Sequence, residues 1–286
     1  MTIQISGKTR VCGLIGDPVE HTMSPAMHNA AFKELGLDYV YVAFRVKADE
    51  LGKAIQGMRA LGIRGLNVTI LHKVDVMSLL DRLDPMAENI GAVNTIVNDG
   101  GILTGYNTDA TGFLQPLLEH KINLKVKKVA ILGAGGGSRG ICFILAEHGA
   151  KLTIINRGID SAKDLAAHTS KLFGVTVASL ELHESNLASA ITENEILVNA
   201  TSVGMSPNPG ESIVPAKLLR PGLIVYDIVY NPVNTRLLKE AETAGAHTIS
   251  GIDMLAWQGA AAFERWTGEK APVALMKKEA MKILEK

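Results

Sequence analysis

The chain of 286 residues is long enough for two domains of ordinary size. Its 29 basic and 29 acidic residues balance to a formal net charge of zero, and 47% of its residues are hydrophobic. This balance excludes the strongly basic surface with which proteins bind nucleic acids or anionic membranes.

No apolar run is long enough for a transmembrane helix, and the N-terminal segment lacks the apolar centre of a signal peptide. The two cysteines, Cys12 and Cys142, lie in apolar stretches and indicate small core residues rather than a disulfide. These features predict a cytoplasmic protein that does not contact a membrane.

Short apolar strands alternate with helical patterns in the first part of the chain, which predicts an α/β fold. Ser24 is the expected N-cap of one helix, with Pro25 at its first position and Gly36 at its end. Asp99-Gly100 between two apolar runs predicts a β-hairpin. We further expect strands at 11–15, 39–44 and 65–70, and helices at 50–61 and 112–120.

A second series of elements follows the polar, basic stretch at 121–128. Helical segments separate most of its strands, which is the pattern of a Rossmann-like, doubly wound parallel sheet. After Gly251 the pattern is helical. The strands of this series are expected at 129–132, 152–155, 175–178, 196–199, 223–227 and 247–250.

The segment GAGGGSRG lies between a predicted strand and a predicted helix. Its spacing is Gly133-x-Gly135-x-x-Ser138, in which Gly133 permits a tight turn and Gly135 lets a pyrophosphate approach the backbone. The helix N-terminus offers free N–H groups to the phosphates. This context favours dinucleotide binding over the alternative, in which the glycines only allow the helix to pack closely on the sheet.

The next predicted strand ends in Asn156-Arg157, where an NAD-binding protein usually has an acidic residue that holds the ribose. A guanidinium pairs well with a 2′-phosphate, whereas an acidic side chain would repel it. Arg157 therefore favours NADP, with NAD as the weaker alternative. A plain solvated charge at the end of a strand is the other interpretation of this arginine.

Thr22 and Ser24 place two hydroxyl groups where they can bind a small carboxylate together, although Ser24 alone could simply be a helix cap. Further motifs share the order and spacing of one family. The chain resembles the shikimate dehydrogenase family, including its quinate/shikimate branch, over nearly its whole length. The motifs that carry the resemblance are NVTILHK (67–73), GAVNT (91–95), GYNTD (105–109), the glycine-rich turn, NATSVGM (199–205), YDIVYNP (226–232) and GIDMLAWQ (251–258).

The resemblance implies roles for individual residues. Lys73 and Asp109 correspond to the catalytic pair, and Asn94 and Gln258 to the amides that bind the ring hydroxyls. The substrate carboxylate would be held by Thr22, Ser24, Thr69 and Tyr230. Cofactor contacts are implied at Gly133, Ala134, Gly135, Gly136, Gly137, Asn156, Arg157, Thr201, Ser202, Ile228 and Gly251.

The chain departs from the family pattern in three respects. Leu71 replaces the usual proline two residues before Lys73, which frees the backbone of that turn. Thr22 replaces the first serine of the hydroxyl pair and adds a methyl group to the pocket. Gly158 and Ser161 stand where the NADP-binding motif usually continues, which predicts a weaker hold on the 2′-phosphate.

A lysine after a strand is by itself most often a surface charge, but these motifs indicate chemistry at Lys73. The implied reaction is the reduction of the ring carbonyl of 3-dehydroshikimate by NADPH, in which the ammonium donates a proton to the new alkoxide. Asp109 would orient the ammonium, and a cap for a helix near Ala110 is the alternative. His21 and His72 are interpreted as bystanders, and no metal is expected.

The resemblance places Gln258 in the substrate site although it follows the Rossmann-like segment. We therefore predict a substrate-binding catalytic domain from residues 1–109 and 252–286, and an inserted NADP-binding domain from 110–251. The expected partners are small molecules of the shikimate pathway to the aromatic amino acids, and a homodimer is compatible with the sequence. Quinate or aminoshikimate dehydrogenation is an alternative activity, and a catalytically idle metabolite-binding module is an alternative from another class.

Overall fold

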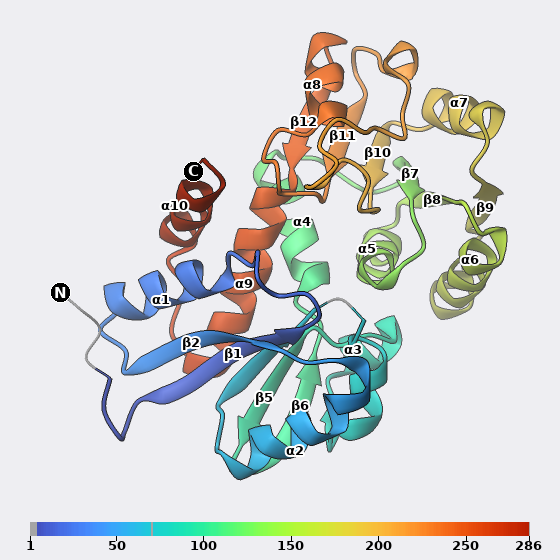
Figure 1. The fold of residues 1–286 in the computed structure, drawn as a ribbon. Helices are drawn as coiled ribbons and strands as arrows, with labels where there is room; N and C mark the ends of the chain where they lie inside the picture. The colour runs from blue at the N-terminus through green and yellow to red at the C-terminus, as the bar shows by residue number, and fades with distance from the viewer. Residues whose placement is uncertain (1–4, 70, 286) are drawn as a thin grey trace. The chain divides into compact units, whose positions relative to one another are not determined.

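Two six-stranded sheets organise the part of the chain that the computed structural model describes, residues 5–69 and 71–285. Each sheet belongs to one of two units (Figure 1). The first unit combines the chain up to Gly112 with the chain from Ala256, and the second runs from Phe113 to Leu255. The predicted α/β class is confirmed for both units.

The sheet of the first unit is mixed. Its strand order is β2-β1-β3-β5-β6-β4, and β5 runs antiparallel to both of its neighbours. The hairpin between β5 and β6 turns at Gly100 and Gly101, both with positive φ, as the Asp-Gly signal predicted. The strands are β1 (Arg10–Gly16), β2 (Tyr39–Arg45), β3 (Gly65–Val68), β4 (Arg82–Leu83), β5 (Thr95–Asp99) and β6 (Ile102–Tyr106).

Helices cover both faces of this sheet (Figure 1). One face packs against α2 (Leu51–Ala60) and α3 (Pro85–Ile90), with aliphatic side chains such as Ile55 and Met58 between them. The other face carries an aromatic cluster between strand β2 and two helices, α1 (Ser24–Glu34) and α9 (Gly251–Thr267). The remaining elements are η1 (Ala48–Glu50), η2 (Asp75–Leu79), α4 (Asp109–Glu119) and α10 (Val273–Leu284).

The sheet of the second unit is parallel throughout, in the order β12-β11-β10-β7-β8-β9. The first three strands of the unit run outward one way and the last three the other, which is the doubly wound topology that the sequence predicted. Helices α5 and α6 lie on one side of it and α7 and α8 on the other (Figure 1). The elements are β7 (Lys128–Leu132), α5 (Gly136–Glu147), β8 (Lys151–Asn156), α6 (Ile159–Phe173), β9 (Ala178–Glu181), α7 (Glu184–Glu193), β10 (Ile196–Asn199), η3 (Ala216–Leu218), β11 (Ile224–Asp227), α8 (Arg236–Thr243) and β12 (His247–Ser250).

Several predicted boundaries are wrong. The strand expected at 175–178 lies at Ala178–Glu181, because the hydrogen-bonded register with β8 begins only at Ala178. Strand β3 ends at Val68, and the last residue of its predicted range, 70, lies outside the described residues. The two short elements β4 and α3 were not predicted.

Two helix starts also differ from the prediction. Ser24 is the first residue of α1 rather than its N-cap, and the residue before it, Met23, makes no side-chain cap. Helix α4 begins at Asp109 instead of 112. The side-chain oxygen of Asn107 accepts a hydrogen bond from the N–H of Ala110 and so satisfies the early start.

Candidate active site

Lys73 lies in a turn that follows strand β3 and is fixed by the backbone. The N–H of Thr69 donates to the carbonyl of Ile15 at 3.0 Å, and the N–H of Val93 donates to the carbonyl of Lys73 at 2.8 Å. Leu71, between them, has φ +77° and leaves 66% of its surface exposed. One end of the turn is therefore tied to strand β1 and the other to the segment before β5, while Leu71 has a backbone conformation that is rare for leucine.

The lysine forms an ion pair with Asp109 at the first position of helix α4. Lys73 Nζ and Asp109 Oδ2 are 2.6 Å apart, and the side chains are 21% and 10% exposed. The other carboxylate oxygen accepts a hydrogen bond of 2.8 Å from the Asn94 amide. Because the carboxylate faces these two groups, Asp109 holds an ammonium, and the cap interaction at Ala110 belongs to Asn107.

Asn94 is buried and has several hydrogen-bond partners. Its amide nitrogen also donates to the hydroxyl of Thr108 at 3.0 Å, and its oxygen accepts from the backbone N–H of Thr108 at 2.7 Å and from the hydroxyl of Thr95 at 3.1 Å. A buried amide with this many partners has one fixed orientation. Asn94 therefore fixes the direction of the Asp109 carboxylate.

The network continues through two residues that the sequence motifs did not indicate as site residues, Asn67 on β3 and Tyr41 on β2. Asn67 donates to the hydroxyl of Thr95 at 3.1 Å and accepts from the hydroxyl of Tyr41 at 2.7 Å. Asn67 and Tyr41 lie inside strands among apolar neighbours, where a polar side chain needs a buried partner. That requirement was the signal in the sequence, but it did not identify the partners.

The hydroxyl pair sits at the start of helix α1. Thr22 Oγ1 and Ser24 Oγ are 3.3 Å apart, and the N–H of Ser24 also donates to Thr22 Oγ1. Burial raises the pKa of Tyr41 well above its usual value, and a hydrogen bond with Ser24 opposes the rise. Ser24 is thus connected through Tyr41 to the network that ends at the ion pair.

Gln258 lies on helix α9, next to helix α4. A Cβ added at Gly112 would lie 2.6 Å from the Gln258 Cβ and 2.7 Å from its backbone nitrogen. Gly112 follows Asp109 by three residues and therefore lies on the same side of α4. Only glycine allows the two helices to come this close, so the first unit brings Gln258 beside the helix that begins with Asp109.

The structure divides the predicted substrate residues between the two units. Tyr230 belongs to the second unit, where burial raises the pKa of its phenol. The first unit contains the others, Lys73, Asp109, Asn94, Gln258, Thr22, Ser24 and Thr69. His72, interpreted as a bystander, is 1% exposed, and its Nε2 donates to the Val46 carbonyl at 2.7 Å. It anchors the turn that carries Lys73.

The glycine-rich turn of the second unit has the features that a dinucleotide requires. Gly133 has φ +106°, and a Cβ there would lie 3.0 Å from both the Ala200 carbonyl oxygen and the Thr201 methyl group. Helix α5 begins at Gly136 with Gly135 as its N-cap residue, and both have open space where a side chain would be. The free N–H groups of this helix end can therefore be approached closely by an anion.

The other predicted cofactor residues are distributed around the carboxyl ends of the parallel strands. Asn156 ends β8, and its amide donates to the Gly158 carbonyl at 3.0 Å. Arg157 follows it with an exposed side chain. Ala134 and Gly137 belong to the glycine-rich turn, Thr201 and Ser202 follow β10, Ile228 follows β11, and Gly251 follows β12 with its backbone against the Ile228 carbonyl. Ligands of doubly wound sheets bind at this edge.

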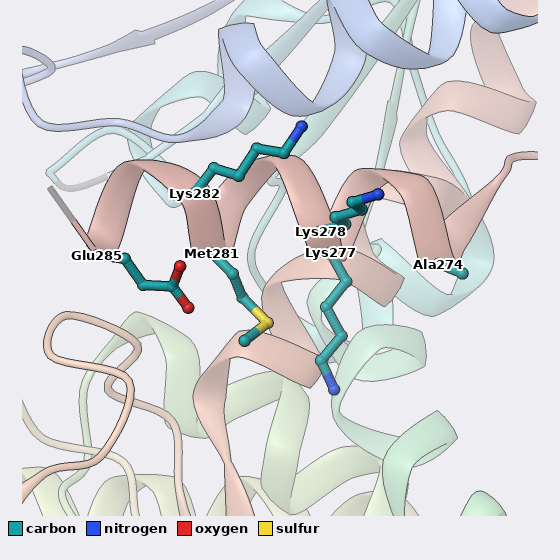
Figure 2. Close-up of a pocket in the computed structure, with 6 residues that line it drawn as sticks. All are labelled: Ala274, Lys277, Lys278, Met281, Lys282 and Glu285. Atoms are coloured by element: carbon teal, nitrogen blue, oxygen red, sulfur yellow. The ribbon is translucent and has the colours of Figure 1, made fainter.

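A hollow on helix α10 lies outside these residues. It is lined by Ala274, Lys277, Lys278, Met281, Lys282 and Glu285, none of which is a predicted site residue (Figure 2). Across residues 5–69 and 71–285, no three His, Cys, Asp or Glu side chains gather as they would around a metal ion. Within the same ranges, no helix has the length and apolarity to cross a bilayer.

Three family models match successive parts of the chain. Residues 14–96 match the shikimate dehydrogenase substrate binding domain, residues 116–214 match shikimate / quinate 5-dehydrogenase, and residues 251–281 match the shikimate 5′-dehydrogenase C-terminal domain. A shikimate dehydrogenase (NADP(+)) of Dehalococcoides mccartyi strain CBDB1 is 48% identical over 273 residues, which cover 96% of each chain.

Solved structures agree with these matches. A shikimate dehydrogenase in complex with NADP+ has a TM-score of 0.94 at 44% identity, covering 99% of this chain and 98% of that one. Shikimate 5-dehydrogenase from Listeria monocytogenes, in complex with shikimate and NAD, has a TM-score of 0.90 at 44% identity, with 97% and 98% covered. The resemblance drawn from the motifs is confirmed, and the chain belongs to the shikimate dehydrogenase family.

Proposed function

We propose that the protein is an NADP-dependent shikimate dehydrogenase that interconverts 3-dehydroshikimate and shikimate. The observation that carries the proposal is the ion pair of Lys73 and Asp109 at 2.6 Å, with Asn94 bound to the second carboxylate oxygen. The amide fixes the carboxylate that holds the ammonium, and the relative described as a shikimate dehydrogenase (NADP(+)) supports a catalytic role for the pair.

Lys73 supplies the proton in this proposal. NADPH, when bound, supplies the hydride, and the ring carbonyl oxygen then carries negative charge. An ammonium has three N–H donors, and one of them is directed at Asp109. The others can hydrogen-bond the developing alkoxide, stabilise its charge and deliver the proton. Asp109 orients the ammonium and can accept a hydrogen bond from a neighbouring ring hydroxyl.

The proposed substrate-binding catalytic domain, residues 1–109 and 252–286, corresponds to the first unit, which runs to Gly112 and resumes at Ala256. Thr22, Ser24 and Thr69 would bind the carboxylate of the ring acid, and Asn94 and Gln258 would bind its hydroxyls. Support comes from the hydroxyl pair at the start of α1 and from Gln258 beside α4. Tyr230 is a further proposed contact of the carboxylate.

Residues 110–251 form the proposed NADP-binding domain. The N-terminus of α5 would hold the pyrophosphate through the backbone at Gly133 to Gly137. Arg157 would pair with the 2′-phosphate and Asn156 would lie beside it, while Thr201, Ser202, Ile228 and Gly251 would line the remaining cofactor surface. NADP is the expected cofactor and NAD a weaker one, since the relatives are described with both.

The alternatives differ in what they would turn over. A quinate or aminoshikimate dehydrogenase would use the same residues on a different ring, and an idle binding module would hold the ring acid without oxidising it. The ordered Lys73–Asp109–Asn94 arrangement supports catalysis. We also propose that the protein acts in the cytoplasm, in the pathway to the aromatic amino acids, and forms a homodimer, which light scattering would check.

The test is the reduction of NADP+ and NAD+ by the purified protein, followed at the nicotinamide absorbance band, with shikimate or quinate as substrate. Shikimate with NADP+ should give the highest kcat/KM. Faster turnover of quinate would replace the proposal by its close alternative. Calorimetric binding of shikimate without turnover of either acid would identify the idle module.

A further inference from the structure

Asp227 ends strand β11 and is completely buried, with 0% of its surface exposed. Asn199 ends the neighbouring strand β10, and the parallel register places the two residues directly opposite each other. The loops that follow the two strands begin with Ala200 and Ile228. A buried acid therefore stands between two segments that carry proposed cofactor contacts.

Its carboxylate accepts three hydrogen bonds. Asn199 Nδ2 and the N–H of Val229 donate to Oδ1 at 2.9 and 3.0 Å, and the hydroxyl of Thr235 donates to Oδ2 at 2.7 Å. All three partners are neutral donors. Keeping a buried carboxylate without a cationic partner is costly, so its position calls for a reason beyond packing.

Asn199 transmits this restraint to Thr201. The amide nitrogen of Asn199 is held by the carboxylate, which directs its oxygen toward Thr201. That oxygen accepts from the hydroxyl of Thr201 at 2.7 Å and from its N–H at 3.2 Å. The Thr201 hydroxyl in turn accepts from the N–H of Val203 at 3.2 Å. The loop after β10 is thus folded around the side-chain amide of Asn199, and the hydrogen bond to Asp227 fixes the orientation of that amide.

The loop after β11 is held by the same residue. The N–H of Val229 binds the Asp227 carboxylate directly, and the N–H of Ile228 donates to the backbone carbonyl of Asn199 at 3.1 Å. Ile228 therefore lies between Asp227 and Val229, which are bound to each other. Through Asn199, Asp227 also fixes the position of Thr201.

We propose that Asp227 is a positioning residue for the cofactor: its carboxylate holds the loops after β10 and β11 so that Thr201 and Ile228 face the dinucleotide. The inference rests on the proposed cofactor contacts of these two residues. Asp227 does not touch the cofactor itself. Burial raises the pKa of Asp227 to about 6, against the three hydrogen bonds that favour the anion, as expected for a carboxylate kept in place at a cost in stability.

The test is the substitution Asp227→Ala in the full chain. It removes both acceptor oxygens, so Asn199, Val229 and Thr235 all lose their partner. We expect the dissociation constant of NADPH, measured by fluorescence titration, to rise roughly threefold to tenfold, while KM for shikimate at saturating NADP+ should stay within about twofold. In Asp227→Asn, the single amide oxygen can still accept from Asn199 and Val229, so this variant should bind NADPH nearly as the parent does.

Thr235→Val is the matched control, since it removes one hydrogen bond from the same carboxylate and leaves those from Asn199 and Val229 in place. Thr235 also caps helix α8 by accepting from the N–H of Leu238, so this variant should lose Tm and keep its affinity for NADPH. If Asp227 were purely structural, its replacement by alanine would instead weaken the binding of NADPH and of shikimate together.

A double-mutant cycle with Thr201→Val tests the route through Asn199. If Asp227 acts on Thr201, the two substitutions should weaken NADPH binding less than the product of their separate effects. Asp227→Ala protein that binds NADPH as the parent does, alone and in the Thr201→Val background, overturns the inference. Arg157→Ala separates this from the proposed function: if that variant also binds NADPH normally, the cofactor surface itself is assigned wrongly.

Discussion

The Lys73 ammonium is held by one oxygen of the Asp109 carboxylate, and replacing the lysine tests whether it is the proton donor. Lys73→Ala should reduce turnover of shikimate by roughly 10²- to 10⁴-fold, because the alkoxide loses its proton donor and its counter-charge. Binding of NADPH should stay near that of the parent, since the cofactor residues lie in other segments. Steady-state kinetics with a fluorescence titration measures both. A folded Lys73→Ala protein with parental turnover would make the lysine a surface charge.

Leu71 offers a second residue-scale prediction, at the position where the family usually has proline. If the loss of the ring merely loosened the turn, restoring proline would keep or raise activity. Proline holds φ near −65°, whereas Leu71 has φ +77°, so the ring would force the turn before Lys73 into another conformation. We expect Leu71→Pro to lower kcat roughly tenfold to a hundredfold, as a misplaced catalytic group does. Leu71→Gly, which accepts positive φ, should keep kcat; equal activity in both variants would contradict this.

Arg157, at the same scale, is the residue that we expect to favour NADP+ over NAD+. Losing one charge-assisted contact costs about 1.5–3 kcal/mol, which corresponds to roughly 10- to 150-fold in binding. Arg157→Ala should therefore raise KM for NADP+ by such a factor and leave KM for NAD+ nearly unchanged. Kinetics with both cofactors at saturating shikimate measures the ratio. Equal losses for the two cofactors would remove the arginine from the 2′-phosphate site.

At the scale of elements, the contact between α4 and α9 is the sensitive one. Gly112→Ala would place a Cβ 2.6 Å from the Gln258 Cβ, so the helices must separate. We expect a lower Tm and a higher KM for shikimate, because Asp109 and Gln258 move apart. Gly57→Ala in α2 is the control: open space surrounds that position, and the substitution should stabilise the protein by about 0.5–1 kcal/mol. Thermal unfolding of both variants checks the contrast.

At the scale of the whole molecule, His28 should make folding sensitive to acid. It stacks on Tyr41 with ring centroids 4.4 Å apart, and neither ring nitrogen has a partner within the described chain. Burial lowers its pKa to about 3, whereas an unfolded histidine titrates near ~6.5. Between these values only the unfolded chain binds the proton. The contribution of the uncharged His28 to the free energy of unfolding is therefore fully present above a pH of about 6.5 and is lost as the pH falls toward 3.

His28→Phe removes this titration and breaks no hydrogen bond. Each unit of pKa difference corresponds to about 1.4 kcal/mol, so the variant should gain more over the parent at about pH 5 than at about pH 8. Denaturant unfolding at the two pH values gives the comparison. A constant difference between the two proteins would mean that His28 is not the group that titrates.

The sequence by itself determined the local features of this protein. Apolar runs with turn residues on both sides marked β10 and β12 at their observed bounds, and Asp99-Gly100 marked the hairpin. The glycine spacing at Gly133 and the family motifs were equally local, since each depends on neighbours a few residues apart. Local patterns failed where partners decide: β9 took its bounds from the register with β8, and α4 began early because Asn107 caps it.

Only the tertiary structure decided how the motifs meet. Lys73, Asn94 and Asp109 lie on separate segments, and Gln258 reaches α4 from the far end of the chain. Neither the 2.6 Å ion pair nor the bond from Asn199 to Asp227 can be derived from spacing, because each depends on which strands become neighbours in a sheet. Strand order and helix contacts arise from packing over the whole chain. A polar residue in an apolar segment of the sequence indicates that its side chain needs a buried partner, but it does not indicate which residue that partner is.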